Sequence, residues 1–168
     1  MEFIVLILLG AILITYGWYW GGVTESRSTA VAVGGLSLVL GGIAIFNPGE
    51  ADVIVWAVAG LTAVFGLLAA ASAYWEQSPD RTLGLYSLLL AVAALLSVGA
   101  DVNATDNLNT LGIAGLILAG VFALVFVAGA LVPGTRAFRS LIGWVMLVAG
   151  AVVAFLGYAE AIGISVGT

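Results

Sequence analysis

The sequence divides into six long apolar segments, and its basic residues occur only at every second connection between them. The segments span about residues 3–22, 30–46, 53–75, 83–100, 111–132 and 138–158. Each is close to the ~20 residues that an α-helix needs to cross the hydrocarbon core of a bilayer. The basic residues are four arginines, Arg27, Arg81, Arg136 and Arg139, which lie at the first, third and fifth connections. A chain of this kind folds as a bundle of membrane-spanning helices.

Composition excludes the other fold classes. Hydrophobic residues make up 63% of the 168 residues, charged residues make up 8%, and the mean hydropathy is +1.25. The strands of a membrane barrel alternate apolar and polar residues, whereas these segments are apolar on every side. The connections are too short to form a soluble domain. The sequence therefore predicts an all-α membrane protein, a six-transmembrane-helix bundle that makes residues 1–168 a single transmembrane domain.

The arginines also predict an orientation. Cytoplasmic connections retain Lys and Arg because these residues resist translocation, so the three arginine-bearing turns are expected in the cytoplasm and both termini outside. The first segment follows Met1-Glu2 without a basic residue, which favours a retained helix over a cleaved signal peptide. We expect a multi-pass protein of the cell membrane. The longest outer connection, 101–110, carries an Asn103-Ala-Thr105 glycosylation pattern whose use depends on the host.

The residue types that the chain lacks restrict its chemistry. It has no Cys, no His and no Lys. Haem and iron–sulfur ligation, thiolate or imidazole metal sites, nucleophile–His relays and Schiff bases all need one of these. We therefore expect no catalytic residues, no cofactor and no metal site. The chain is not expected to be an enzyme, and nothing in it indicates a nucleic-acid partner.

The nine carboxylates lie at the ends of the apolar segments. Proton-coupled carriers usually place an ionisable residue within a helix, where it is costly and kept for function. The outer ends carry Glu2, Glu50, Asp52, Asp101, Asp106 and Glu160, and the inner ends carry Glu25, Glu76 and Asp80. This pattern favours a passive route for an uncharged solute, or a non-transporting structural subunit of a membrane complex. Excess acid without any lysine is typical of a halophilic host.

The aromatic residues and the small residues each allow two interpretations of their role. The predicted inner ends are rich in Tyr and Trp, which fits an interfacial belt or the lining of a pore mouth. These residues are Tyr16, Trp18, Tyr19, Trp20, Tyr74, Trp75, Tyr86 and Trp144. The Gly34-Gly35 and Gly41-Gly42 pairs, and stripes of small residues along the third and fifth segments, allow close helix contact. That contact is either within one protomer or at a seam between protomers.

Two stretches of the chain combine helix glycines, a charged turn and short motifs of small and hydroxyl residues. The first stretch contains Gly10 and Gly17, then Arg27-Ser28-Thr29-Ala30-Val31 and Gly34-Gly35-Leu36-Ser37. The second contains Gly60, Ala70-Ala71, Asp80-Arg81 and Tyr86-Ser87-Leu88. In these motifs the chain resembles a known family, the six-helix urea and amide channels of the AmiS/UreI group. The resemblance covers roughly residues 1–95 well and the remainder through hydropathy. It implies a passive channel for urea or a short-chain amide, with a lipid bilayer around it and a homo-oligomer, a hexamer, as its assembly.

The resemblance also implies which side chains line the pathway. The candidates are aliphatic, aromatic and hydroxyl residues of the first five segments. They are Leu6, Leu9, Leu13, Ser37, Thr62, Phe65, Tyr86, Ser87 and Phe122. The chain departs from the family further along, because its fifth segment lacks the family's tryptophans and its sixth lacks the family's carboxylate. These departures leave the expected fold intact and leave the identity of the solute open.

Overall fold

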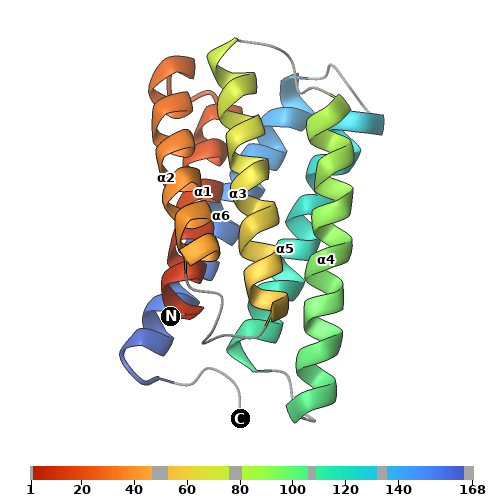
Figure 1. Cartoon of the computed structure of the whole chain (residues 1–168). Helices are drawn as coiled ribbons and strands as arrows, with labels where there is room; N and C mark the ends of the chain where they lie inside the picture. Colours follow the sequence, from red (N-terminus) through yellow and green to blue (C-terminus); the bar gives the residue numbers. More distant parts are fainter. Residues whose placement is uncertain (1, 47–52, 76–80, 106–108, 132–135, 165–168) are drawn as a thin grey trace.

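The computed structural model describes residues 2–46, 53–75, 81–105, 109–131 and 136–164. Within these ranges the chain forms six long helices (Figure 1). They are α1 (Glu2–Trp20), α2 (Ser26–Phe46), α3 (Val53–Tyr74), α4 (Arg81–Thr105), α5 (Thr110–Phe126) and α6 (Arg136–Ala161). A turn of π-helix, η1 (Val127–Leu131), extends α5. All six are long and apolar enough to cross a membrane, which confirms the predicted all-α bundle.

Local hydrogen bonds explain two of the helix starts. α2 begins four residues earlier than predicted, because the Ser28 and Thr29 hydroxyls donate to the Glu25 carbonyl at 3.0 and 2.9 Å and close the first turn. α5 begins after Asn109, whose side-chain oxygen accepts the backbone N–H groups of residues 111 and 112 at 2.9 and 3.0 Å. This is an N-cap, which satisfies backbone donors that the first turn leaves unpaired.

The prediction of a ten-residue connection over 101–110 was wrong. Residues 101–105 continue α4 as its last turn, and α5 begins at Thr110. The helix extends past its apolar part because backbone hydrogen bonds do not require apolar side chains, so hydropathy does not report where the helix ends. The Asn103 pattern therefore lies at a helix end and not in a loop.

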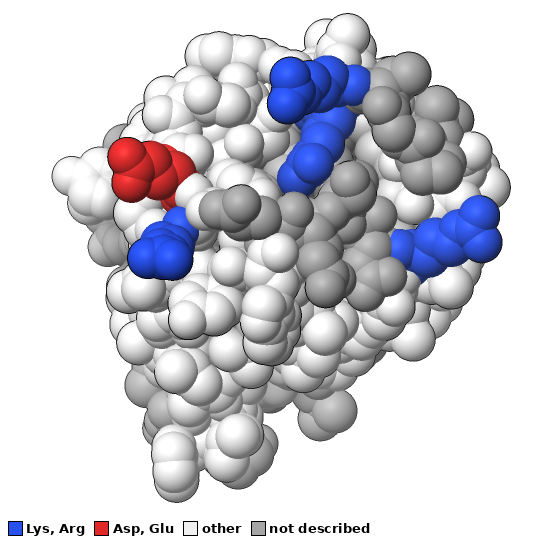
Figure 2. Space-filling model, turned by 90° about the horizontal axis from the view of Figure 1, so that it is seen from above, with Lys and Arg blue, Asp and Glu red and all other residues white. Residues whose placement is uncertain are grey.

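The six helices close into a ring in chain order. Each helix contacts the next one, and α1 contacts α6 most extensively of all. The helices alternate in direction, so α1 begins and α6 ends at one end of the bundle (Figure 1). The starts of α2, α4 and α6 lie at the opposite end, where the basic side chains are spread over the surface (Figure 2). We call this the arginine end.

The odd-numbered helices contribute more to the interior than the even-numbered ones. In the apolar window of α3, 61% of the residues are buried, compared with 28% in α2. α1 also contacts α3 directly, although the two are not consecutive in the ring. Side chains that face the centre therefore come mainly from α1, α3 and α5.

Glycines allow α1 and α6 to approach closely. Gly10 and Gly17 on α1 face Gly150 and Gly143 on α6, and Gly157 of α6 lies against Leu6 of α1. The glycines of each helix are seven residues, or two turns, apart. A methyl group built on Gly10 would lie 2.5 Å from the Gly150 carbonyl oxygen, and one on Gly17 would lie 2.6 Å from the Gly143 carbonyl oxygen. Any larger residue would force the backbones apart.

The glycine pairs of α2 are divided between the bundle and its outer surface. Methyl groups on Gly34 and Gly41 would contact Ala70 and Ala63 of α3 at 3.5 and 3.4 Å. Gly35 and Gly42 have nothing within 4 Å of such a group. Packing within one protomer thus accounts for Gly34 and Gly41, and only Gly35 and Gly42 lie free on the outside of the described bundle.

Candidate functional site

One stripe of α1 is buried against the neighbouring helices, and its Leu6 and Leu13 lie beside Gly157 and Gly150 of α6. Leu6, Leu9 and Leu13 are all buried, as the pore-lining interpretation requires of them. Their spacing of three and then four residues continues to Tyr16 and Trp20, which are 0% and 4% exposed. Alternating steps of three and four keep residues on one helix face. The three leucines therefore share one buried face of α1 with Tyr16 and Trp20, and this face ends at the arginine end.

Aromatic rings from the three inner helices meet in the middle of the bundle. The Tyr16 ring of α1 lies 6.2 Å from the Phe65 ring of α3, and Phe65 lies 5.1 Å from Phe122 of α5, both edge to face. All three side chains are fully buried. Edge-to-face contact is a favoured arrangement of aromatic rings. Together the rings pack against one another in the interior between α1, α3 and α5.

The buried hydroxyl groups bond to their own helices. Ser37 donates to the Val33 carbonyl at 2.7 Å, Thr62 to Val58 at 2.8 Å, and Ser87 to Leu83 at 2.6 Å. Hydroxyl groups in apolar helices commonly bond back to the preceding turn in this way. These three residues are buried in the bundle, and each hydroxyl already donates its hydrogen bond to a carbonyl of its own helix. Their role in lining a pathway stays a prediction.

Tyr86 differs from the other candidates. It is only partly buried, and its hydroxyl donates to the Leu61 carbonyl at 3.1 Å, which joins α4 to α3. The other eight candidates are buried inside the bundle.

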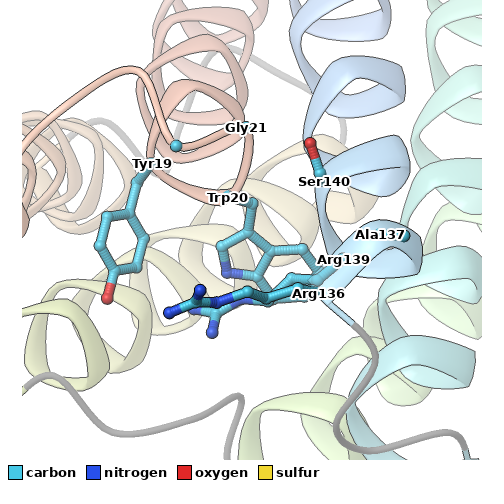
Figure 3. A pocket seen from close by; sticks show the side chains of 8 residues that line it. Tyr19, Trp20, Gly21, Arg136, Ala137, Arg139 and Ser140 are labelled. Atoms are coloured by element: carbon cyan, nitrogen blue, oxygen red, sulfur yellow. The ribbon is translucent and has the colours of Figure 1, made fainter.

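A cavity of about 470 Å³ opens at the arginine end, between α1 and α6 (Figure 3). It is lined by aromatic, basic and small residues from the end of α1 and the start of α6. These are Tyr19, Trp20, Gly21, Gly22, Arg136, Ala137, Arg139 and Ser140. No carboxylate is among its described lining residues. Trp20 joins this cavity to the interior, because its ring lies 5.5 Å from the ring of Tyr16.

Arg139 lies over two aromatic rings of α1. Its guanidinium carbon is 5.3 Å from the centre of the Trp20 ring and 5.6 Å from that of Tyr19. At these distances the negative ring faces attract the cation. The described residues give Arg139 no carboxylate partner. Among the described residues, a positive charge is therefore held at the entrance to the interior by aromatic rings.

Three buried polar atoms in this region lack a hydrogen-bond partner. They are the Tyr16 hydroxyl, the Trp20 indole Nε1 and the Arg139 Nε. Trp20 and Ser72 are polar neighbours of the Tyr16 hydroxyl, but neither meets it with hydrogen-bond geometry. Buried polar groups are usually bonded, so an unpaired group commonly has water or a ligand as its partner. The arrangement suits a small molecule that accepts hydrogen bonds.

The described carboxylates lie outside this region. Glu25 precedes α2 at the arginine end, and Glu160 lies in the last turn of α6 at the other end. The described residues contain no group of three His, Cys, Asp or Glu side chains that could hold a metal ion. Glu50, Asp52, Glu76, Asp80 and Asp106 fall outside the described residues.

Sequence reasoning placed Tyr16 and Trp20 among eight belt or pore-mouth aromatics and could not separate them. The structure divides the group. Trp18, Tyr74, Trp75 and Trp144 are exposed, as a belt requires, whereas Tyr16 and Trp20 face the interior. Their spacing from Leu6, Leu9 and Leu13 was the signal that could have found them. Arg139 was missed because it was used only as a topology marker.

Comparisons with known proteins agree with this architecture. The model of the AmiS/UreI family of transporters matches residues 1–158. The crystal structure of the urea channel from Helicobacter pylori has a TM-score of 0.73 and 21% sequence identity, over 96% of this chain and 98% of that chain. The electron cryomicroscopy structure of the H. pylori urea channel in its closed state has a TM-score of 0.67, with 20% identity and the same coverage. No curated protein matches the chain by sequence.

Proposed function

Since the chain belongs to the AmiS/UreI family of transporters, we propose that it is a passive channel for a small uncharged solute such as urea or a short-chain amide. The family consists of transporters and not enzymes, and the chain is a multi-pass membrane protein. The observation that carries the proposal is the neutral middle of the bundle. Its described side chains there are apolar, aromatic or hydroxyl groups, and none can take up a coupling proton.

The aromatic contacts in the centre are compatible with passive movement. Each edge-to-face pair contributes only about 0.5–1.5 kcal/mol beyond its buried area. Tyr16, Phe65 and Phe122 are held against one another by two such pairs. A solute that enters from the cavity can pass when thermal rotation separates the rings. No covalent step and no large helix movement is needed.

Osmotic swelling of liposomes tests the proposal. Purified protein is expected to accelerate swelling with urea, formamide or acetamide, independently of a pH gradient or membrane potential. Phe122→Trp enlarges a ring in the centre and should slow the flux, while Phe155→Trp makes the same change on the exposed face of α6 and should not. Swelling no faster than in empty vesicles with all three solutes would reject the channel and favour a non-transporting structural subunit.

We also propose that the arginine end faces the cytoplasm, that both termini lie outside the cell membrane, and that the protein is a homo-oligomer. The shared end of the four arginines supports the orientation. The outer face of α2 supports the assembly, since Val31, Leu38 and Ile45 are exposed there beside Gly35 and Gly42. A hexamer follows only from the resemblance. The acidic, lysine-free composition supports a halophilic host.

A further inference from the structure

The three unpaired donors lie at the point where the arginine-end cavity meets the interior. Trp20 lines the cavity and contacts both Arg139 and Tyr16. Its ring centre lies 5.3 Å from the Arg139 guanidinium carbon and 5.5 Å from the centre of the Tyr16 ring. Tyr16 in turn contacts Phe65 at 6.2 Å, in the closed centre of the bundle. A solute that moves between the cavity and the centre must therefore pass these side chains.

The unpaired atoms of all three groups can donate hydrogen bonds. The Trp20 indole and the Arg139 guanidinium can only donate hydrogen bonds, and the Tyr16 hydroxyl can donate one. The Arg139 charge has no carboxylate partner among the described residues, and no described carboxylate lines the cavity. Such a site attracts a neutral molecule with a strong acceptor, such as a carbonyl oxygen. It repels a cation, because nothing in the described lining compensates the arginine charge.

The two helices that supply the donors are held in a fixed relation. Arg139 lies one turn before Gly143, and a methyl group on Gly143 would lie 2.6 Å from the backbone nitrogen of Gly21, next to Trp20. Close backbone contact leaves little freedom for one side of the site to move relative to the other. The donors are therefore positioned before a solute arrives, which reduces the cost of binding.

We propose that Tyr16, Trp20 and Arg139 form the selectivity site of the channel, which binds the carbonyl oxygen of an amide-type solute and excludes cations of the same shape. This inference rests on the proposed function and deepens it. Urea and guanidinium are the appropriate pair of probes. Both are small planar molecules, but guanidinium has an NH₂ group where urea has its carbonyl oxygen, and its positive charge is delocalised over the whole ion.

The test compares urea and guanidinium uptake in liposomes that contain the wild type or single variants. Tyr16→Phe and Trp20→Phe each remove one donor and keep an aromatic ring. Each is expected to lower urea flux at low urea concentration about threefold to tenfold, the loss expected for one hydrogen bond. Tyr158→Phe and Trp144→Phe make the same changes on the exposed face of α6 and should leave flux unchanged. Retained helix content and elution volume establish that the variants fold.

Arg139 variants separate the charge from the donors. Arg139→Met should admit guanidinium, which the wild type excludes, and should lower urea flux as well. Arg139→Lys keeps the charge, and it should retain guanidinium exclusion. Osmotic water flow, which needs no carbonyl acceptor, should change less than urea flux in every variant.

The outcomes distinguish this inference from the function on which it rests. A wild type that does not conduct urea would reject the channel itself. A wild type that conducts urea, with unchanged urea flux in Tyr16→Phe and Trp20→Phe and continued guanidinium exclusion in Arg139→Met, would overturn the selectivity site alone. Equal losses of urea and water flow would also overturn it, since they would indicate general damage to the pathway.

Discussion

Gly10 and Gly42 are both helical glycines, but replacing them with alanine should change stability in opposite directions. A methyl group on Gly10 would lie 2.5 Å from the Gly150 carbonyl oxygen and 2.7 Å from the Ala154 Cβ, whereas ordinary contact begins at 3.4 Å. α1 and α6 would have to separate to admit it. Gly42 has nothing within 4 Å of the corresponding position, so its methyl group would extend into open space.

The magnitudes follow from two terms. Alanine is more favourable than glycine within a helix by about 1 kcal/mol, and this gain applies to both variants. Overpacking of a close contact costs about 1–3 kcal/mol. Gly42→Ala should therefore raise the free energy of unfolding by up to about 1 kcal/mol. The free energy of unfolding of Gly10→Ala should be lower than that of Gly42→Ala by about 1–3 kcal/mol, because the helix-propensity gain is common to both variants and cancels in the comparison.

Unfolding of monomeric protein in mixed micelles with increasing dodecyl sulfate, followed by circular dichroism, measures this difference, so that a contact between protomers at Gly42 does not enter it. Gly143→Ala provides a second close-contact variant and Gly99→Ala a second open one, since Gly99 also has nothing within 4 Å. The contact model requires both close-contact variants to be less stable than both open ones. Equal stability of the Gly10 and Gly42 variants would refute the reasoning and would mean that α1 and α6 are not in close contact.

The remaining predictions concern topology, pH and assembly. A cysteine at Ala104 should react with an impermeant thiol reagent added to intact cells, whereas one at Ser78 should not, and the opposite pattern would invert the orientation. Urea flux should change less than about twofold between pH 5 and 8, since the chain has no His and its carboxylates have reference pKa values near 4, so a steep rise on acidification would contradict an ungated pore. Gly42→Leu should dissociate the oligomer in nanodiscs without loss of helix content, and a monomeric wild type would exclude the assembly.

The fold was predictable because the bilayer limits what a chain can do. Segment length and all-round apolarity indicate helices, and the arginine positions indicate that alternate connections share an end. The last turn of α4 was not predictable from these signals. This turn contains Asp101 and is stabilised by backbone hydrogen bonds. Hydropathy measures only the apolarity of side chains, so it does not detect such bonds.

The site was only partly predictable, since burial depends on how each helix is rotated about its axis. The spacing of Leu6, Leu9 and Leu13 defined a face, and continuing the same spacing would have included Tyr16 and Trp20. A tyrosine or tryptophan near the end of an apolar segment reads equally well as part of an interfacial belt. Only the position of the neighbouring helices decides between these interpretations.

The α1–α6 pairing could not be derived from either helix alone. Both helices carry glycines at seven-residue spacing, but similar spacing occurs on α2, where only one glycine of each pair packs inward. Choosing the partner requires knowing that the ring closes between the first and last helices, a contact at the greatest distance along the sequence. Sequence periodicity gives the face that packs but not what it packs against.

That closing contact links stability to selectivity. Gly17 of α1, and Gly21 just after α1, lie against Gly143 of α6. Gly21 directly follows Trp20, and Gly143 lies one turn after Arg139. The donors from α1 and the guanidinium from α6 thus keep their relative positions because the two backbones touch beside them. Recognition of a molecule as small as urea tolerates displacements of only about 0.5 Å. The absence of side chains at these glycines is therefore as necessary to the proposed site as the side chains that form it.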